Sequence, residues 1–188
     1  MSIAQTVVYK LKNVTQSGLG RSLNRLAKIA AGLYFDVFVR EYRTAGLSFV
    51  IRRDQTNREM RGKFTVDTCE LPERTLIERH MPPGASVLEL GAYIGVVSCF
   101  INRRLALPAR HLAVEANPYL IDALSANRER NQGKFDVLNS VISRDPVAFV
   151  STDKTMDSNS LQSTVMEVKT MTVEQVEQRE GWQFDTLV

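Results

Sequence analysis

The sequence has few of the residues that build metal centres and disulfide frameworks. Among its 188 residues there are two cysteines and two histidines. Cys69 and Cys99 stand alone, without the spacing of a zinc site or a Cys-x-x-Cys redox pair, and neither His80 nor His111 has a recognisable partner in sequence. The sequence therefore predicts no metal site, and we interpret both histidines as structural or surface residues rather than catalytic bases.

Long apolar runs are also missing. No segment approaches the roughly 18 consecutive apolar residues that cross a bilayer, and Lys10 and Lys12 interrupt the only early apolar run that resembles a secretory signal. We therefore expect a cytoplasmic protein. The chain is long enough to bury a real core, and its composition is that of a globular domain.

Negative charge is absent from the start of the chain, because no acidic residue precedes Asp36. Apolar residues recur there at helical spacing: Leu19, Leu23, Leu26, Ile29, Ala30 and Leu33. This pattern predicts an amphipathic helix with a cationic flank. We expect its apolar stripe to pack on the rest of the domain; the alternative is peripheral contact with an anionic membrane surface or docking on a partner.

Residues 1–68 are interpreted as an N-terminal extension and residues 69–188 as the main domain. Two short apolar runs at 47–51 and 63–66 flank a polar stretch, which predicts a hairpin-like lead-in after the helix. This segment is basic, but it lacks interleaved aromatic residues and any recognised nucleic-acid motif. We therefore expect no nucleic acid partner.

The most informative stretch runs from Val87 to Gly95. Residues 87–90 can form a strand buried on both faces, and Gly91 lets the backbone leave the carboxyl end of that strand without a Cβ in the way. The next helix is expected to begin near Gly95, with its free N–H groups and positive dipole end facing a crevice. A ligand that carries a carboxylate or a phosphate can bind at such a position.

Glycine spacing narrows the choice of ligand. The dinucleotide fingerprint G-x-G-x-x-G needs a second glycine where Tyr93 stands, so a dinucleotide-dependent oxidoreductase is a disfavoured alternative. The arrangement of Glu89, Gly91 and Gly95, acidic-x-Gly-x-x-x-Gly, resembles the first motif of class I S-adenosylmethionine-dependent methyltransferases.

A second acidic residue follows at the end of another short apolar strand. Residues 112–114 lead into Glu115, 24 residues beyond Gly91. A carboxylate at the end of the second strand of a βαβ unit can accept hydrogen bonds from both hydroxyls of a ribose. Glu115 is therefore the candidate ribose-binding residue.

The intervening segments complete an alternating pattern. Residues 96–107 predict a crossover helix, Asn117 is a candidate N-cap for the next helix, and residues 135–142 predict a third strand. Asn139 or Ser140 would then lie near the base of a bound nucleoside. The polar segment at 151–163 predicts a loop near the mouth of the site.

These motifs together resemble the FkbM family of methyltransferases. The string Glu-Leu-Gly-Ala-Tyr-Ile-Gly at 89–95, the string Glu-Ala-Asn-Pro at 115–118, and the pair Asn127 and Asn131 correspond to D-x-G-A-N-x-G, E-P-N-P and a twin-asparagine helix in that family. The resemblance extends from about Phe64 to the end of the chain. Two residues depart from the family pattern: Tyr93 replaces asparagine and Ala116 replaces proline.

The resemblance implies a Rossmann-like α/β fold, S-adenosyl-L-methionine as methyl donor, and O-methylation of a sugar or polyketide-type hydroxyl. It gives Glu89 a role in orienting the motif loop and the amino group of the cofactor. No catalytic base is identified. The implied cofactor-binding residues are Glu89, Gly91, Ala92, Tyr93, Gly95, Glu115, Ala116 and Ser140.

The end of the chain departs from the family more strongly. Residues 168–176 and 184–188 resemble the family's strand, short helix and approach to a fourth sheet strand, but the segment that follows in the family is absent after Val188. We therefore expect a methyltransferase sheet that is incomplete at its C-terminal end. An inactive cofactor-binding or scaffolding fragment is the second alternative.

Overall fold

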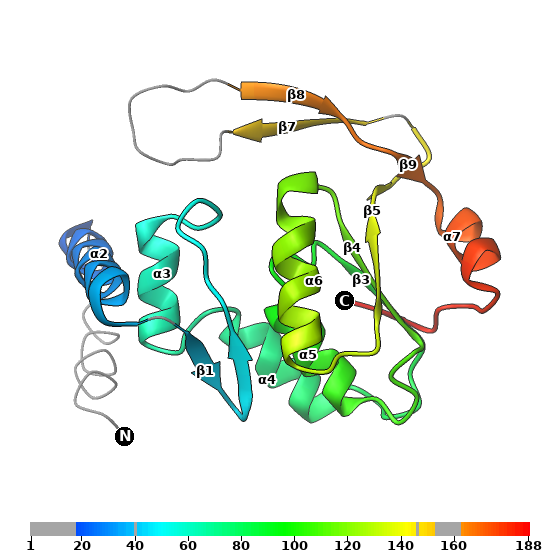
Figure 1. Cartoon of the computed structure of the whole chain (residues 1–188), viewed down its shortest axis with the longest axis horizontal. Coiled ribbons are helices and arrows are strands. Elements are labelled where there is room, and N and C mark those ends of the chain that lie inside the picture. The colour runs from blue at the N-terminus through cyan, green and yellow to red at the C-terminus, as the bar shows by residue number, and fades with distance from the viewer. Residues whose placement is uncertain (1–17, 40, 146, 153–162) are drawn as a thin grey trace.

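The computed structural model describes residues 18–39, 41–145, 147–152 and 163–188, with the side chains of 18–24, 148–152 and 163–167 left out. Its centre is a parallel sheet of four strands (Figure 1). In spatial order these are β10 (Thr186–Leu187), β3 (Val87–Leu90), β4 (His111–Glu115) and β5 (Asp136–Asn139).

Helices cover both faces of this sheet (Figure 1). On one face lie α5 (Val96–Arg104) and α6 (Ile121–Arg130), the latter preceded by the 3-10 turn η2 (Pro118–Leu120). On the other face, α7 (Val173–Glu180) places Val176 against the strand residues Leu88 and Leu112. Because both faces are buried, β3 and β4 read as apolar runs, and the mixed α/β architecture is compatible with a Rossmann-like fold.

The strand order reverses beside β3. The chain passes from β3 to β4 and then to β5 in one direction, and it returns to form β10 on the opposite side of β3. All the neighbouring pairs are parallel. The carboxyl ends of β3 and β10 therefore flank a topological switch point, which is where open α/β sheets bind their ligands.

The predicted third strand is divided in two. Residues 136–139 form β5 in the central sheet, whereas β6 (Val141–Ile142) pairs with β9 (Thr170–Met171). In the segment predicted as a polar loop, residues 151–152 end the strand β7 (Ala148–Thr152) and Ser163 begins its partner β8 (Ser163–Glu167). Residues 153–162 lie outside the described part of the chain.

Several other predicted boundaries hold closely. The strand predicted at 87–90 is β3, and the tail forms the expected strand, short helix and fourth sheet strand as β9, α7 and β10. The helix predicted over 96–107 ends earlier, at Arg104. Before β3 in the chain, α4 (Leu71–His80) packs against α5, and Ile77 and Ile101 belong to the same buried apolar cluster.

From residue 18 on, the described part of the N-terminal extension has two helices and one hairpin. Its elements in chain order are α2 (Gly18–Phe38), β1 (Tyr42–Thr44), β2 (Leu47–Phe49) and α3 (Arg58–Thr65). The strand predicted at 63–66 is therefore wrong, since most of these residues are helical. Asn57 caps α3 by accepting the N–H of Met60, and Phe64 is buried in the core, so capping and packing override the strand propensity of Phe-Thr-Val.

The backbones of α2 and α3 touch where the two helices cross. A Cβ added at Gly32 would lie 2.1 Å from the carbonyl oxygen of Arg58, and one added at Gly62 would lie 2.0 Å from that of Lys28. Only glycine fits at either position.

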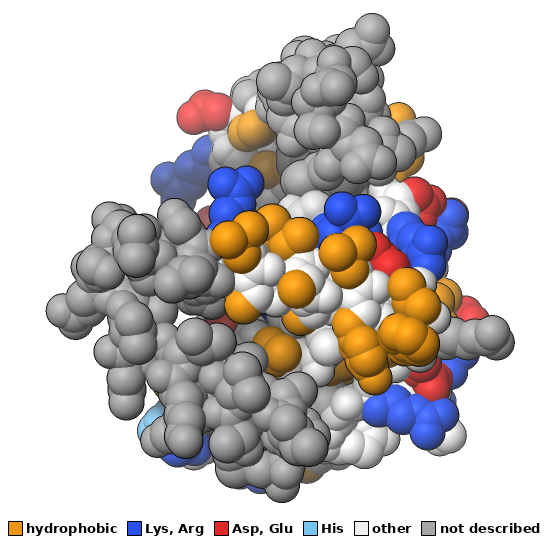
Figure 2. Space-filling model, turned by 90° about the vertical axis from the view of Figure 1, so that its left-hand side faces the viewer, with side chains coloured by type: hydrophobic (Ala, Val, Ile, Leu, Met, Phe, Trp, Pro, Cys, Tyr) orange, Lys and Arg blue, Asp and Glu red, His pale blue; other side chains and the backbone are white. Residues whose placement is uncertain are grey.

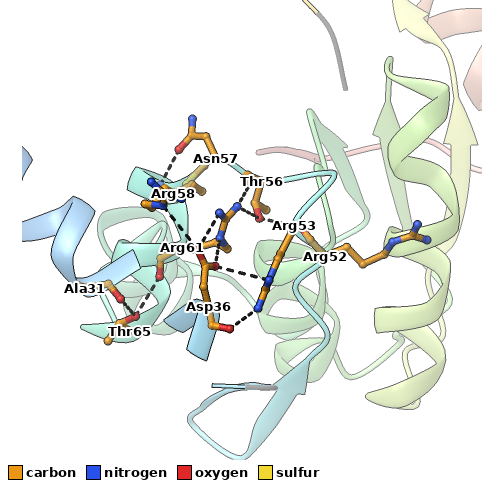
Figure 3. A network of polar contacts seen from close by, with 10 residues as sticks. Ala31, Asp36, Arg52, Arg53, Thr56, Asn57, Arg58, Arg61 and Thr65 are labelled. Atoms are coloured by element: carbon orange, nitrogen blue, oxygen red, sulfur yellow. Dashed lines mark hydrogen bonds and ion pairs between the residues drawn. The ribbon is translucent and has the colours of Figure 1, made fainter. Parts of the chain in front are cut away.

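An ion pair between Asp36 and Arg61 connects the same two helices (Figure 3). The carboxylate of Asp36 on α2 accepts a hydrogen bond from Arg61 Nε on α3 at 2.6 Å, and Arg61 also donates to the carbonyl of Thr56. The Nε atoms of Arg58 and Arg53 lie 3.6 and 3.9 Å from the same carboxylate. Since the Arg61 side chain is buried, removing either partner would leave an uncompensated charge.

Part of the apolar stripe predicted on the first helix is exposed to solvent, while the side chains of Leu19 and Leu23 lie outside the described residues. Among the residues of α2 whose side chains are described, 25–38, the buried ones are Gly32 and Phe35, whereas Leu26 and Leu33 of the predicted stripe are 62% and 47% exposed. The expectation of a packed stripe is therefore wrong for these two leucines. The two leucines are exposed because Gly32, on the opposite face of the helix, lets that face approach α3 closely.

The extension nevertheless shares its core with the main domain. Phe35, Phe49 and Phe64 belong to the same buried apolar cluster as two residues of the main domain. These are Ile94, in the loop before α5, and Phe100, in α5. Within the described residues, no helix combines the length and apolar character needed to cross a membrane.

Candidate functional site

The loop between β3 and α5 has an unusual backbone. Gly91, Tyr93 and Gly95 have positive φ angles of 82°, 52° and 85°. The N–H groups of Gly91 and Ala92 both donate to the carbonyl of Val114, at 2.8 and 3.0 Å. The loop is therefore bonded directly to the carboxyl end of β4 and is held at the edge of the sheet.

The two glycines of this loop have different surroundings. Gly91 is exposed, and a Cβ added there would meet no atom within 4 Å, whereas a Cβ at Gly95 would lie 2.7 Å from Leu124 Cδ1. Gly95 thus permits close packing of the start of α5 on α6. Gly91 leaves open space beside the switch point, where a ligand can approach the backbone.

Tyr93 occupies a left-handed conformation that asparagine adopts more readily than tyrosine. The asparagine in the motif that this stretch resembles would therefore fit this backbone with less strain than tyrosine. The tyrosine hydroxyl donates to the carbonyl of Gln55 at 3.0 Å, and burial raises the pKa of the phenol. The side chain therefore ties the motif loop to the segment that follows β2.

Glu115 lies at the end of β4 and links two loops. Its Oε2 accepts the N–H of Tyr93 at 2.8 Å, and its Oε1 accepts the N–H of Asn117 at 2.7 Å. Burial raises the pKa of this carboxyl, and the backbone hydrogen bonds oppose that shift. Glu115 is 7% exposed. Because a carboxylate can accept about four hydrogen bonds, it retains some acceptor capacity beyond these backbone groups.

Glu89 lies in the interior instead of at the open edge. Its side chain is 3% exposed, and Oε2 lies 3.0 Å from Nε2 of the fully buried His111. Val87 pairs with His111 in the β3–β4 register, and Glu89 is two residues further along, so both side chains stand on the same sheet face. This agrees with a structural His111, whereas a role of Glu89 toward a cofactor amino group stays a prediction.

The two polar residues predicted near the base make contacts within the fold. Asn139 donates to the carbonyls of Glu115 and Ala116 at 2.7 and 3.1 Å, and it thereby supports the backbone at the end of β4. Ser140 is 1% exposed and its hydroxyl donates to the carbonyl of Lys169 at 2.6 Å. The hydroxyl of Ser140 is thus used to join β6 to β9.

The twin asparagines of α6 hold the hairpin against the site. Asn131 accepts the N–H of Ser48 at 2.9 Å and donates to the Ser48 carbonyl at 2.8 Å. Asn127 accepts the N–H of Val50 at 2.9 Å and donates to the carbonyl of Ile94 at 2.9 Å. These side-chain amides bond to the backbone of β2 and of Val50, as the backbone of a neighbouring strand would. Asn127 also bonds to the carbonyl of Ile94 in the loop between β3 and α5. Only the family resemblance indicated these residues, because their partners lie more than 30 residues away in sequence.

Two further ionisable groups lie behind the loop at the start of α4. Burial raises the pKa of Glu70 to about 7, and the negative charges of Glu89 and Glu73 add to the shift. Burial likewise raises the pKa of the Cys69 thiol to about 12, so this cysteine is a protonated core residue and a poor nucleophile. Among the residues that the structure describes, no group of three or more His, Cys, Asp or Glu side chains is arranged to hold a metal ion.

No model of a known protein family matches the chain, and no curated protein matches it either.

Proposed function

We propose that this chain binds S-adenosyl-L-methionine at the carboxyl edge of β3 and β4 and is a methyltransferase of the FkbM type. The acceptor in this proposal is the hydroxyl of a sugar or a polyketide-type molecule, as the resemblance implies. One observation supports the cofactor site in particular. Gly91 leaves open space at the switch point, and Glu115 on the adjacent strand accepts a hydrogen bond from the same loop.

The residues present fit the adenosyl and methionyl parts of such a donor. Open α/β sheets bind ligands outside the carboxyl ends of their strands at this topological position. The carboxylate of Glu115, at the end of β4, is an acceptor of the kind that binds the hydroxyls of a ribose. The first turn of α5 begins at Val96, directly after the loop, and the positive end of its dipole favours a carboxylate.

When bound, the donor would supply an electrophilic methyl group to the acceptor hydroxyl. The chain's own contribution is to bind and orient the donor through the backbone at Gly91 and the carboxylate of Glu115. None of the described residues is assigned as the base that takes the hydroxyl proton.

A matched pair of glycine variants tests the cofactor site. Gly91 and Gly181 both have positive φ, 82° and 75°, and a Cβ at either position meets no atom within 4 Å. Alanine therefore introduces similar backbone strain at both, on the order of 1 kcal/mol. In a calorimetric titration with S-adenosylhomocysteine, we expect Gly91→Ala to bind about tenfold more weakly or worse, and Gly181→Ala to bind like the parent.

Equal losses in the two variants, or unchanged binding by Gly91→Ala, would contradict the proposal. Glu115→Ala is a less specific variant, because it also removes the acceptor for the N–H groups of Tyr93 and Asn117. A thermal-shift comparison separates the proposal from a dinucleotide enzyme: stabilisation by NAD and not by S-adenosylhomocysteine would overturn the cofactor assignment.

A further inference from the structure

The outward side of α2 presents apolar side chains to solvent. We define the outer face of α2 as Leu26, Leu33, Tyr34, Val37 and Phe38, whose exposed fractions range from 47% to 71%. Leu26, Leu33 and Val37 are spaced seven and four residues apart, so they lie on one side of the helix. Figure 2 shows apolar side chains gathered on this side of the molecule.

This face is held outward by the contacts on the opposite side of the helix. Gly32 and Gly62 bring the backbones of α2 and α3 together, and Asp36 forms its ion pair with the buried Arg61 (Figure 3). If α2 rotated to turn the outer face inward, the ion pair would break and the backbones of α2 and α3 would lose their close contact at Gly32 and Gly62. The exposure is therefore a property of the packed helix.

The net charge differs between the two segments of the chain, and the outer face of α2 belongs to the positively charged N-terminal segment. Residues 1–68 contain twelve Lys and Arg against five Asp and Glu, a formal charge of +7. Residues 69–188 contain twelve against sixteen, a formal charge of −4. The Arg25, Arg53 and Arg58 side chains on and beside α2 and α3 are 48–75% exposed. Arg25 lies 4.0 Å from the partly exposed Glu59, and Arg53 and Arg58 lie near Asp36, which is 13% exposed, so three exposed cations face two carboxylates here.

We propose that the outer face of α2 docks on an anionic lipid membrane. Its leucine, valine and aromatic side chains would enter the boundary between headgroups and acyl chains, while the arginines meet anionic headgroups. Tyr34 and Phe38, whose rings lie 5.0 Å apart, add the aromatic surface typical of this boundary. Pairing with a second copy is disfavoured, since it would bring together two surfaces of the same positive sign.

Vesicle flotation tests this proposal with a matched control. The probes are phosphatidylcholine vesicles with and without phosphatidylglycerol. The double variant Leu26→Ser/Val37→Ser removes apolar area from the outer face, and Leu76→Ser/Leu107→Ser removes similarly exposed leucines from the main domain. We expect the parent and the control to bind the anionic vesicles, increasingly weakly at higher salt, and the outer-face variant to bind about tenfold more weakly or worse.

Circular dichroism should show the same helix content in all three proteins, because the substituted side chains are exposed. Absence of binding by the parent, equal binding by the outer-face variant, or equal binding to neutral vesicles would overturn the proposal. A dimer in light scattering that Leu26→Ser/Val37→Ser converts to a monomer, without vesicle binding, would assign the face to a second copy instead. Since S-adenosylhomocysteine binding is measured separately, this result is independent of the proposed function.

Discussion

At the scale of single residues, Glu70 combines burial with negative neighbours. It occupies the N-cap position of α4 in a left-handed conformation, and its side chain makes no capping hydrogen bond. Glu89 and Glu73 oppose its ionisation, and Arg74 and Lys63 only partly offset them. The charged form of Glu70 is therefore less favourable in the folded protein than in the unfolded chain.

This gives stability a dependence on pH with a defined sign. The folded pKa is about 7 against an ordinary value of 4.5, so the folded protein binds more protons between these values. The free energy of unfolding from this group therefore falls as pH rises from about 4.5 to about 7. We expect Glu70→Gln to increase the free energy of unfolding by about 1–3 kcal/mol at pH 8 and by little at pH 4.

Urea unfolding at the two pH values measures this difference. Glu78→Gln, an exposed change on the same helix, is the control and should reproduce the pH dependence of the parent. A Glu70→Gln variant that gains no stability at pH 8 relative to pH 4 would contradict the assigned burial.

Residue roles at the site were only partly predictable from sequence. The motif placed Gly91 and Glu115 correctly at the ends of adjacent strands, because strand patterns and glycine turns are local signals. The contact of Glu89 with His111 depends on the register of two strands 22 residues apart, and no local pattern specifies it. The same applies to Asn127, whose partners Val50 and Ile94 come from two other segments.

At the scale of secondary-structure elements, the crossing of α2 and α3 depends on missing side chains. Gly62→Ala would place a Cβ against the carbonyl oxygen of Lys28, so the helices must separate, and we expect a loss of about 2–4 kcal/mol. Gly84→Ala is the control, because a Cβ there meets no atom within 4 Å and its φ is not positive. It should leave stability unchanged or raise it by about 0.5 kcal/mol.

Thermal unfolding of the two variants checks this prediction. Equal melting temperatures for Gly62→Ala and Gly84→Ala would mean that the two helices do not touch as described. A reduced melting temperature in Gly62→Ala alone would support the close crossing.

The elements of the main domain were predicted more accurately than those of the extension. Strands buried on both faces produce continuous apolar runs, so β3 and β4 stand out in the sequence. Residues 63–66 have strand-like composition, but their helix is decided by the Asn57 cap and by the position of Phe64 in the core. For α2, the sequence showed the apolar stripe, while the choice of buried face depended on contact with α3.

At the scale of the whole molecule, the extension and the sheet domain share one apolar core. Phe35, Phe49 and Phe64 pack in the same cluster as Phe100 and Phe135. Removing the extension would expose the outer surfaces of α5 and α6. We therefore expect residues 18–68 and the sheet to unfold together.

Two probes can test this cooperativity. The single tryptophan, Trp182, lies after α7 and packs against Phe184, whereas far-ultraviolet circular dichroism is dominated by helices that include α2. We expect the urea transitions from tryptophan fluorescence and from circular dichroism to coincide. A dichroism transition that begins at lower urea would show that the extension unfolds independently.

The asparagine pair on α6 also affects how the molecule behaves at high concentration. A hairpin with an open edge offers its N–H and carbonyl groups to strands of other molecules. Here the outward groups of Ser48 and Val50 are already hydrogen-bonded to side-chain amides from a helix, which cannot extend a ladder. The protein thereby closes β2 to edge-to-edge aggregation without adding a third strand.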